Sequence, residues 1–559
     1  MVNKIKILSF WPFILLLLGL IFFEYYPLRF DFTQDKRFSL RKETLALLDS
    51  LEKPLHITVY LDGDMHPSFK RLQQATEALL IDYRQVANKT IQISFVDPLA
   101  GMNLEKQSEV IQNLGTVGIR PIQIYFTRDE GVTQKLIFPM ALIDDGESLI
   151  PVNLLSKISG SATRYEENIN SSIAQLEYSF SSRIQALKNR ELPRIGFTEG
   201  HGEPDNRYLL DAFRSLSESY LVGRVDLQKI QKSGLDSLKV LVIAQPKNAF
   251  SELEKYKLDY FIQQGGRVIW ALDKVQISLA DLQSGDYKLA QPSDLNLDDM
   301  LFEFGIRIPA NLVSDLNAAP IPITSGELGQ NSIQLLPWVY FPIGIPDISH
   351  KISYKIDPLK LQFASTIDTL QTTGIKKSVI LKTSGRTKVM PAPFPLSLQL
   401  IGKKIASEEY QAGEQTLGVL LEGNFKSSFF FRGAPEGIME TFPKRDISVF
   451  NKMIVISDGD VFTNDLDEEE ENPKTLGYDS FSDTQYGNKA FLLNAIDYLA
   501  LDRPLLELRN REVQLRLIDK VKAKSSKWIW QFWGFGLPLI MLITLVIFQH
   551  YYRMYRYAK

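Results

Sequence analysis

The chain contains no cysteine among its 559 residues. It therefore cannot form a disulfide bond, bind a metal through thiolates or use a cysteine nucleophile. A chain without thiols suits an oxidising compartment, where a free thiol would be a liability. Histidine is also scarce, with five residues in all, and none of them has the HExxH spacing of a zinc hydrolase.

Several sequence motifs and one kind of charge distribution are also absent. The sequence has no GxxxxGK[ST] motif, so we expect that this chain does not hydrolyse ATP by itself. It has no GxSxG nucleophile elbow and no repeat with a period of about 20–50 residues. Lys and Arg total 63 against 66 Asp and Glu, a net charge of −3. Because nucleic-acid binding needs concentrated positive charge, we expect no nucleic-acid partner.

Two long apolar segments lie near the ends of the sequence. Residues 7–23 are long for a signal peptide and are not followed by a small-residue cleavage site. Residues 528–548 match the thickness of a bilayer core and carry aromatic residues at both ends. We therefore expect both segments to lie in the lipid bilayer. The predicted parts are an N-terminal transmembrane anchor (1–28), a linker (511–527), a C-terminal transmembrane helix (528–549) and a basic cytoplasmic tail (550–559).

The basic residues beside these segments predict the topology. Lys4 and Lys6 precede the first segment, and Arg553, Arg556 and Lys559 follow the second, which places both termini in the cytoplasm. Lysines within residues 520–527 oppose this assignment, but a long translocated domain is largely exempt from the rule. The prediction is a two-pass protein of the inner (cytoplasmic) membrane, with the bulk of the chain in the periplasm.

The composition between the anchors is that of a folded body, with 45% hydrophobic and 23% charged residues. Since one core rarely grows beyond roughly 250–300 residues, we expect two domains. Residues 29–190 show the order βαβαββα, in which residues 122–127 and 136–144 form a hairpin, and predict a first α/β domain. Residues 191–510 alternate helices with strands at 194–198, 222–227, 239–244, 267–271 and 452–457, in the pattern of a doubly wound parallel sheet. An insertion at 275–433 is richer in proline and glycine and predicts hairpins and loops.

Polar residues follow two predicted strands of the second domain, where α/β sheets place their ligands. These candidate ligand-binding residues are Glu199, His201 and Glu203 after residues 194–198, and Asp458 and Asp460 after residues 452–457. A histidine flanked by carboxylates suits acid–base chemistry or metal binding. Turn and helix-cap chemistry explains the same residues without a ligand. The acidic run 465–471 lacks the pattern of a calcium loop. We therefore expect no metal site, no cofactor and no catalytic residues.

Several segments together resemble the GldG family, the gliding-motility ABC transporter auxiliary proteins of Bacteroidetes. The resemblance covers essentially the whole chain and depends on the order and spacing of its motifs. The segments are RFDFTQDKRFSLRKETLALLDSLEKPLHITVYLDG (29–63), FVDP (95–98), IGFTEGHGEP (195–204), KVLVIAQPKNAFSELEKYKLDYFIQQGGRVIWALD (239–273) and FGIRIPANLVSD (304–315).

The resemblance implies more than the residues do alone. It implies that the first domain is similar to a module of intraflagellar-transport proteins and the second to glutamine-amidotransferase-like domains, whose enzymes use a cysteine that this chain lacks. It implies a membrane permease subunit (GldF-like), a separate cytoplasmic ATPase subunit (GldA-like), and a link to gliding motility and type IX secretion. A homodimer would match a two-fold permease.

The expected function is therefore that of a non-catalytic, membrane-anchored periplasmic subunit of an ABC transporter complex. It would couple the permease and the ATPase to an extracytoplasmic client. Two alternatives remain open. One is an anchored envelope hydrolase that uses Glu199, His201 and Glu203. The other is a ligand-binding receptor that uses the strand-end crevice near Glu199 and Asp458.

Overall fold

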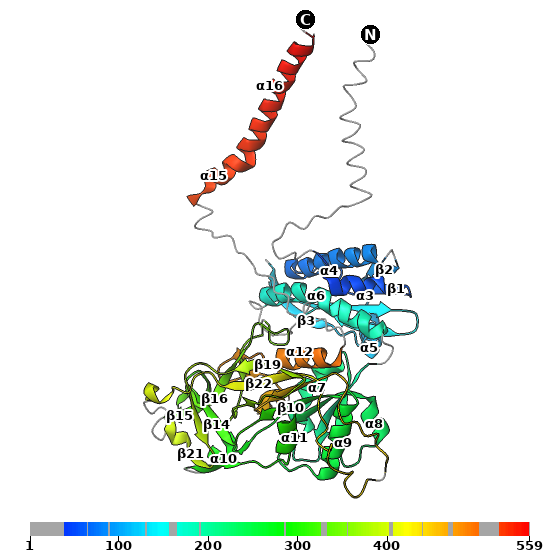
Figure 1. Cartoon of the computed structure of the whole chain (residues 1–559). Helices are drawn as coiled ribbons and strands as arrows, with labels where there is room; N and C mark the ends of the chain where they lie inside the picture. Colours follow the sequence, from blue (N-terminus) through cyan, green and yellow to red (C-terminus); the bar gives the residue numbers. More distant parts are fainter. Residues whose placement is uncertain are drawn as a thin grey trace. The chain divides into compact units, whose positions relative to one another are not determined.

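The computed structural model of the chain is shown in Figure 1. It describes residues 39–63, 65–87, 90–128, 131–155, 165–188, 192–283, 287–325, 332–354, 356–401, 406–438, 440–467, 473–501 and 525–557. The chain divides into two compact units, Met1–Arg511 and Glu512–Lys559. The predicted N-terminal membrane segment and the predicted domain boundary at 190/191 lie outside the described residues.

The N-terminal part of the first unit has mixed α/β structure, as the sequence predicts. Its main sheet has the order β2-β1-β5-β6, in which β1 pairs in parallel with β2 and antiparallel with β5. The elements are α3 (Lys42–Asp49), β1 (Leu55–Val59), α4 (Pro67–Val86), β2 (Ile91–Phe95), α5 (Leu104–Thr116), β3 (Ile122–Arg128), β4 (Gly131–Ile137), β5 (Met140–Asp144), β6 (Leu149–Asn153) and α6 (Tyr165–Lys188).

One predicted hairpin of this region differs in the structure. We expected residues 122–127 to pair with a single strand at 136–144. Instead β3 pairs with β4 in a separate two-stranded sheet, and β5 joins the main sheet beside β1. Pro139 lies between β4 and β5 and has no N–H to donate to a ladder, which explains why the strand is divided there.

The second part of the same unit is organised around a ten-stranded sheet. Five strands run in parallel in the order β8-β7-β9-β10-β23. They are β7 (Arg194–Glu199), β8 (Leu221–Asp226), β9 (Leu238–Ala244), β10 (Arg267–Ala271) and β23 (Asn451–Ile456), close to the strands predicted from the sequence. Antiparallel pairing extends the sheet beyond β23 through β22 (Thr416–Gly423), β19 (Ile375–Lys382), β16 (Ser332–Pro346) and β15 (Ala318–Ser325).

The remaining elements are short strands and covering helices. The strands are β11 (Val275–Gln276), β12 (Lys288–Pro292), β13 (Ile306–Arg307), β14 (Asn311–Asp315), β17 (Leu359–Lys360), β18 (Asp368–Thr369), β20 (Thr387–Pro391), β21 (Phe394–Leu396), β24 (Tyr478–Asp479) and β25 (Thr484–Gln485). The helices are α7 (Leu210–Ser217), α8 (Lys232–Ser237), α9 (Glu252–Gln263), α10 (Leu279–Gln283), α11 (Asp298–Glu303) and α12 (Asn488–Ala500).

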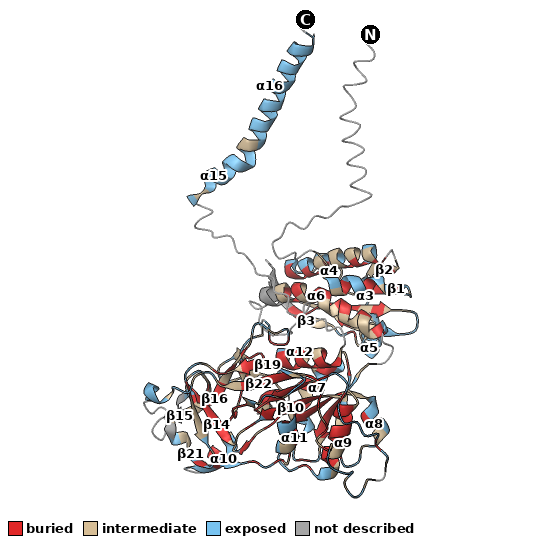
Figure 2. Ribbon diagram, in the orientation of Figure 1, coloured by how far each residue is buried: buried red, intermediate tan, exposed pale blue. Residues whose placement is uncertain are grey.

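The four inner parallel strands, β7, β9, β10 and β23, are buried on both faces, whereas the edge strand β8 is largely exposed or half-buried (Figure 2). In β9, Val240 and Val242 belong to the core cluster that includes α7 and α12, whereas Leu241 and Ile243 belong to the cluster that includes α9 and α11. This explains why residues 239–244 read as a continuous apolar run rather than an alternating one. The carboxyl ends of these parallel strands meet at one edge of the sheet.

The second unit contains one long apolar helix. It runs over Lys527–Tyr557 through α15 (Lys527–Gln531), a π-helical turn (Phe532–Gly536) and α16 (Leu537–Tyr557). Its most apolar 18-residue window has a mean hydropathy of 2.0, and none of it is buried. At 1.5 Å per residue this helix exceeds the ~30 Å of a bilayer core. The described residues thus contain one helix that is long and apolar enough to cross a membrane, where the C-terminal span was predicted.

Candidate functional site

His201, one of the predicted site residues, lies in a buried cluster just beyond β7. Its side chain is only 4% exposed. Its Nδ1 atom lies 3.3 Å from Oε1 of Glu203, and its Nε2 atom lies 3.1 Å from Oε1 of Glu254. The ring stacks on Phe250 with the two ring centroids 3.8 Å apart. Both ring nitrogens of the histidine are therefore occupied by carboxylates.

Glu254 was not among the predicted site residues, although the sequence carries a signal for it. It is the third residue of α9, and it forms a capping box with Ser251. Its Oε2 accepts hydrogen bonds from the Ser251 backbone N–H (2.8 Å) and hydroxyl (2.7 Å), which leaves Oε1 for His201. The Ser-x-x-Glu spacing predicts this cap, but not the histidine that meets it.

In this cluster the histidine and the two glutamates each favour the charged form of the other. Burial lowers the pKa of His201, but hydrogen bonds and electrostatic attraction from Glu203 and Glu254 outweigh burial and raise it. Burial raises the pKa of Glu203 and of Glu254, but their hydrogen bonds, including those with His201, bring both pKa values below the ordinary range. The arrangement is that of a buried ion triad that holds the loop after β7 to the start of α9.

Glu199 occupies a different environment from His201. Its Oε2 lies 3.3 Å from Nε of Arg224 on the neighbouring strand β8, and its side chain is 47% exposed. Gly200 and Gly202, on either side of His201, have positive φ angles of 108° and 80°. These two turns place the His201 side chain in the core, whereas the Glu199 side chain pairs with Arg224 on β8.

Asp458 and Asp460 lie with a third aspartate, Asp273, at the carboxyl ends of β23 and β10. One carboxylate oxygen from each of the three lies within 4.8 Å of the others. Gln245, which follows β9, donates from Nε2 to Oδ2 of Asp273 (3.2 Å) and to Oδ1 of Asp460 (2.7 Å). The sequence predicts Asp458 and Asp460 but not Asp273 or Gln245, although both also follow predicted strands.

The three aspartates resist ionisation. Burial raises the pKa of Asp273, and hydrogen bonds from Gly459 and Gln245 only partly offset it. Burial, with repulsion from Asp273, also raises the pKa of Asp460. Burial, and then the charges of Asp460 and Asp273, raise the pKa of Asp458 well above its ordinary value. Such a cluster holds protons or a cation at neutral pH.

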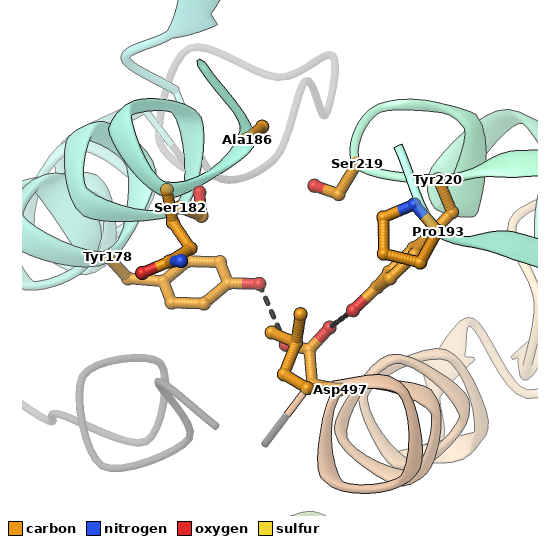
Figure 3. A pocket seen from close by; sticks show the side chains of 9 residues that line it. Tyr178, Ser182, Ala186, Pro193, Ser219, Tyr220 and Asp497 are labelled. Carbon is orange, nitrogen blue, oxygen red and sulfur yellow. Dashed lines mark hydrogen bonds between the residues drawn. The ribbon is translucent and has the colours of Figure 1, made fainter. Parts of the chain in front are cut away.

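A further buried carboxylate lies beside a small cavity lined in part by α6 (Figure 3). Asp497 on α12 accepts a hydrogen bond from Tyr178 Oη at Oδ2 (2.9 Å) and one from Tyr220 Oη at Oδ1 (2.6 Å). Burial raises the pKa of Asp497 to about 7. These contacts join α6 to α12 and to the residue that precedes β8, and no sequence motif indicates them.

The comparisons with solved structures give only distant similarities. A structure titled "mmIFT52 N-terminal domain" is 11% identical with a TM-score of 0.31, and covers 55% of this chain and 96% of that one. A putative ThuA-like protein from Parabacteroides merdae is 10% identical with a TM-score of 0.28, and covers 56% and 92%. No curated protein matches the chain.

Two family models match the sequence. Residues 34–144 match a domain of unknown function (DUF7088). Residues 192–495 match the ABC transporter auxiliary model, described as "ABC-type uncharacterized transport system". The second match includes both carboxylate clusters and extends over more than half of the 559 residues. The chain therefore belongs to the ABC transporter auxiliary family, a family of ABC-type transport systems.

Proposed function

We propose that the chain is a non-catalytic, membrane-anchored subunit of an ABC-type transport system, which couples a permease and a separate ATPase to an extracytoplasmic client. The observation that carries this proposal is the family match over residues 192–495. Membership of such a family implies permease and ATPase partners in general. The exposed apolar helix Lys527–Tyr557 supports attachment of the same chain to the membrane.

The geometry of His201 supports a non-catalytic body. A general base must come within hydrogen-bond reach of the proton it removes. His201 is buried, and both of its ring nitrogens already face carboxylates, Glu203 and Glu254. Glu199, the third member of the proposed hydrolase set, is engaged with Arg224. A stabilising triad accounts for these contacts better than an envelope hydrolase does.

The finer assignments extend this proposal. We propose a two-pass protein of the inner membrane with both termini in the cytoplasm, a periplasmic body, and a doubly wound, amidotransferase-like second domain. We propose GldF-like and GldA-like partners and a role in gliding motility and type IX secretion. The cysteine-free composition and the resemblance of the segments at 29–63 and 195–204 to the GldG family support these assignments.

Purification from native membranes tests the proposal. The tagged full chain, extracted in mild detergent at native expression level, should carry with it a multi-span permease and an ATPase with a GxxxxGK[ST] motif. The Glu199→Gln variant should assemble and function as the wild type does, and so should Glu218→Gln, which alters a comparable exposed ion pair with Arg183. A chain that purifies only alone contradicts the proposal. Loss of function in Glu199→Gln alone, with assembly intact, favours the hydrolase.

A further inference from the structure

Three adjacent parallel strands each end in polar residues that converge on one point. Gln245 follows β9, Asp273 follows β10, and the segment Asp458-Gly459-Asp460 follows β23. Because β9, β10 and β23 pair side by side in parallel, these residues share the carboxyl edge of the sheet. Open α/β sheets bind their ligands at this edge.

The hydrogen bonds around the three aspartates leave one fully buried oxygen without a partner among the described residues. Asp273 accepts from the backbone N–H of Gly459 (2.7 Å) and from Gln245, which also donates to Asp460. Asp458 Oδ2 accepts from the backbone N–H of Gln362 (2.5 Å). Asp458 Oδ1 is fully buried and has no hydrogen-bond partner in the described part of the chain. A buried carboxylate oxygen in that state needs a proton or a cation.

Lys247, a positive side chain that acts on this cluster, does not fill this role. Lys247 lowers the pKa of Asp273 and of Asp460 by electrostatic attraction, but it is exposed, and it is not among the groups that lower the pKa of Asp458. Asp273 and Asp460 keep partial contact with solvent, whereas Asp458 has none. Solvent therefore reaches the cluster at Asp273 and Asp460 but not at Asp458.

We propose that Asp273, Asp458 and Asp460 form a binding site for a hard divalent cation such as calcium. The donors are carboxylate oxygens, which suit calcium, magnesium or manganese rather than softer metals. One oxygen from each carboxylate lies within 4.8 Å of the others, so the three can surround a single such ion.

The backbone at Gly459 passes very close to the side chains of the site. A Cβ atom at Gly459 would lie 2.7 Å from Oδ2 of Asp273 and 2.7 Å from Cγ of Gln245. Only glycine allows the turn to pass so close to these two side chains. Gln245 itself has a positive φ of 52° and links Asp273 to Asp460 through its amide. Gln245 is therefore a positioning residue for two of the three ligands.

Titration of the full chain in detergent, after treatment with a chelator, tests the site. Calcium chloride should give saturable binding, within the ~10⁻⁴–10⁻³ M range typical of extracellular calcium sites or tighter. Binding should also raise the melting temperature. Manganese, another hard divalent cation, should give a paramagnetic resonance signal of bound ion that calcium displaces.

Two variants make the test specific. Asp460→Asn should weaken calcium binding at least about tenfold. Asp497→Asn, which changes another buried carboxylate with a raised pKa, should leave binding unchanged. Wild-type protein that does not bind calcium would overturn the proposal. So would an Asp460→Asn variant that melts higher and binds calcium as the wild type does. Binding that disappears only when the acidic run 465–471 is neutralised would do the same.

Discussion

Removal of the His201 side chain tests how this part of the molecule is held together. His201→Ala leaves Glu203 and Glu254 buried without the positive charge that faces both of them. Breaking one partner out of a buried ion pair typically destabilises a protein by about 3–5 kcal/mol. At roughly 2 °C per kcal/mol for a domain of this size, the melting temperature should fall by about 6–10 °C.

The effect should depend on pH in a defined window. The pKa of His201 is raised, so its contribution to stability is full below its ordinary value of 6.5 and is lost as pH rises through the folded-state pKa. The pKa values of Glu203 and Glu254 are lowered, so their contributions are full above 4.5 and are lost as pH falls through their folded-state values. The difference between wild type and His201→Ala should therefore be largest between about pH 4.5 and 6.5.

Thermal unfolding and hydrogen exchange provide the readouts. Exchange should accelerate in the amides of α9, whose first turn contains Glu254, and remain unchanged in α4. His56→Gln is the control, since His56 is exposed on β1. In a Glu254→Gln background, where the glutamine retains the capping geometry, His201→Ala should cost at least about 1 kcal/mol less. A destabilisation that is small, independent of pH and unchanged in that background would refute the ion triad.

Three further predictions concern other buried groups. Since the pKa of Asp497 is raised from 3.8 to about 7, wild type should lose roughly 4 kcal/mol between pH 4 and 7, and Asp497→Asn should remove this part of the pH dependence of the melting temperature. Gly459→Ala should destabilise the chain by about 1–3 kcal/mol in thermal unfolding, because its Cβ would overlap Asp273. Lys257→Met should lose about 1–3 kcal/mol, because the ammonium of Lys257 donates to three backbone carbonyls; an unchanged melting curve would contradict that role.

The sequence predicts the central strands of the parallel sheet well, because β9, β10 and β23 are buried on both faces and give continuous apolar runs. It fails where one residue changes the pairing. The sequence of residues 136–144 predicts a single strand. In the structure Pro139 divides it, and β5 pairs with β1 in a different sheet from β4. The predicted pattern could not reveal this, because the apolar residues on both sides of Pro139 fit either arrangement.

The candidate site was predictable only in part, for a related reason. Residues that follow a strand can be identified locally, as Asp458 and Asp460 were. Their partners depend on strand order: Gly459 and Asp273 are 186 positions apart, yet their hydrogen bond is 2.7 Å long. His201 was identified, but its burial against Glu254 follows from how the loop after β7 meets α9. Strand order and loop packing are properties of the folded chain, which a local pattern does not contain.

The side of the membrane on which the body lies is the most direct test of the account. The chain has no cysteine, so a single introduced cysteine reports its own position without background. Tyr287, 70% exposed on the body, and Tyr557, 61% exposed at the end of α16, are suitable sites. In intact spheroplasts a membrane-impermeant maleimide should label Tyr287→Cys, and it should label Tyr557→Cys only after permeabilisation. The reverse pattern would place the body in the cytoplasm and contradict the proposed transport role.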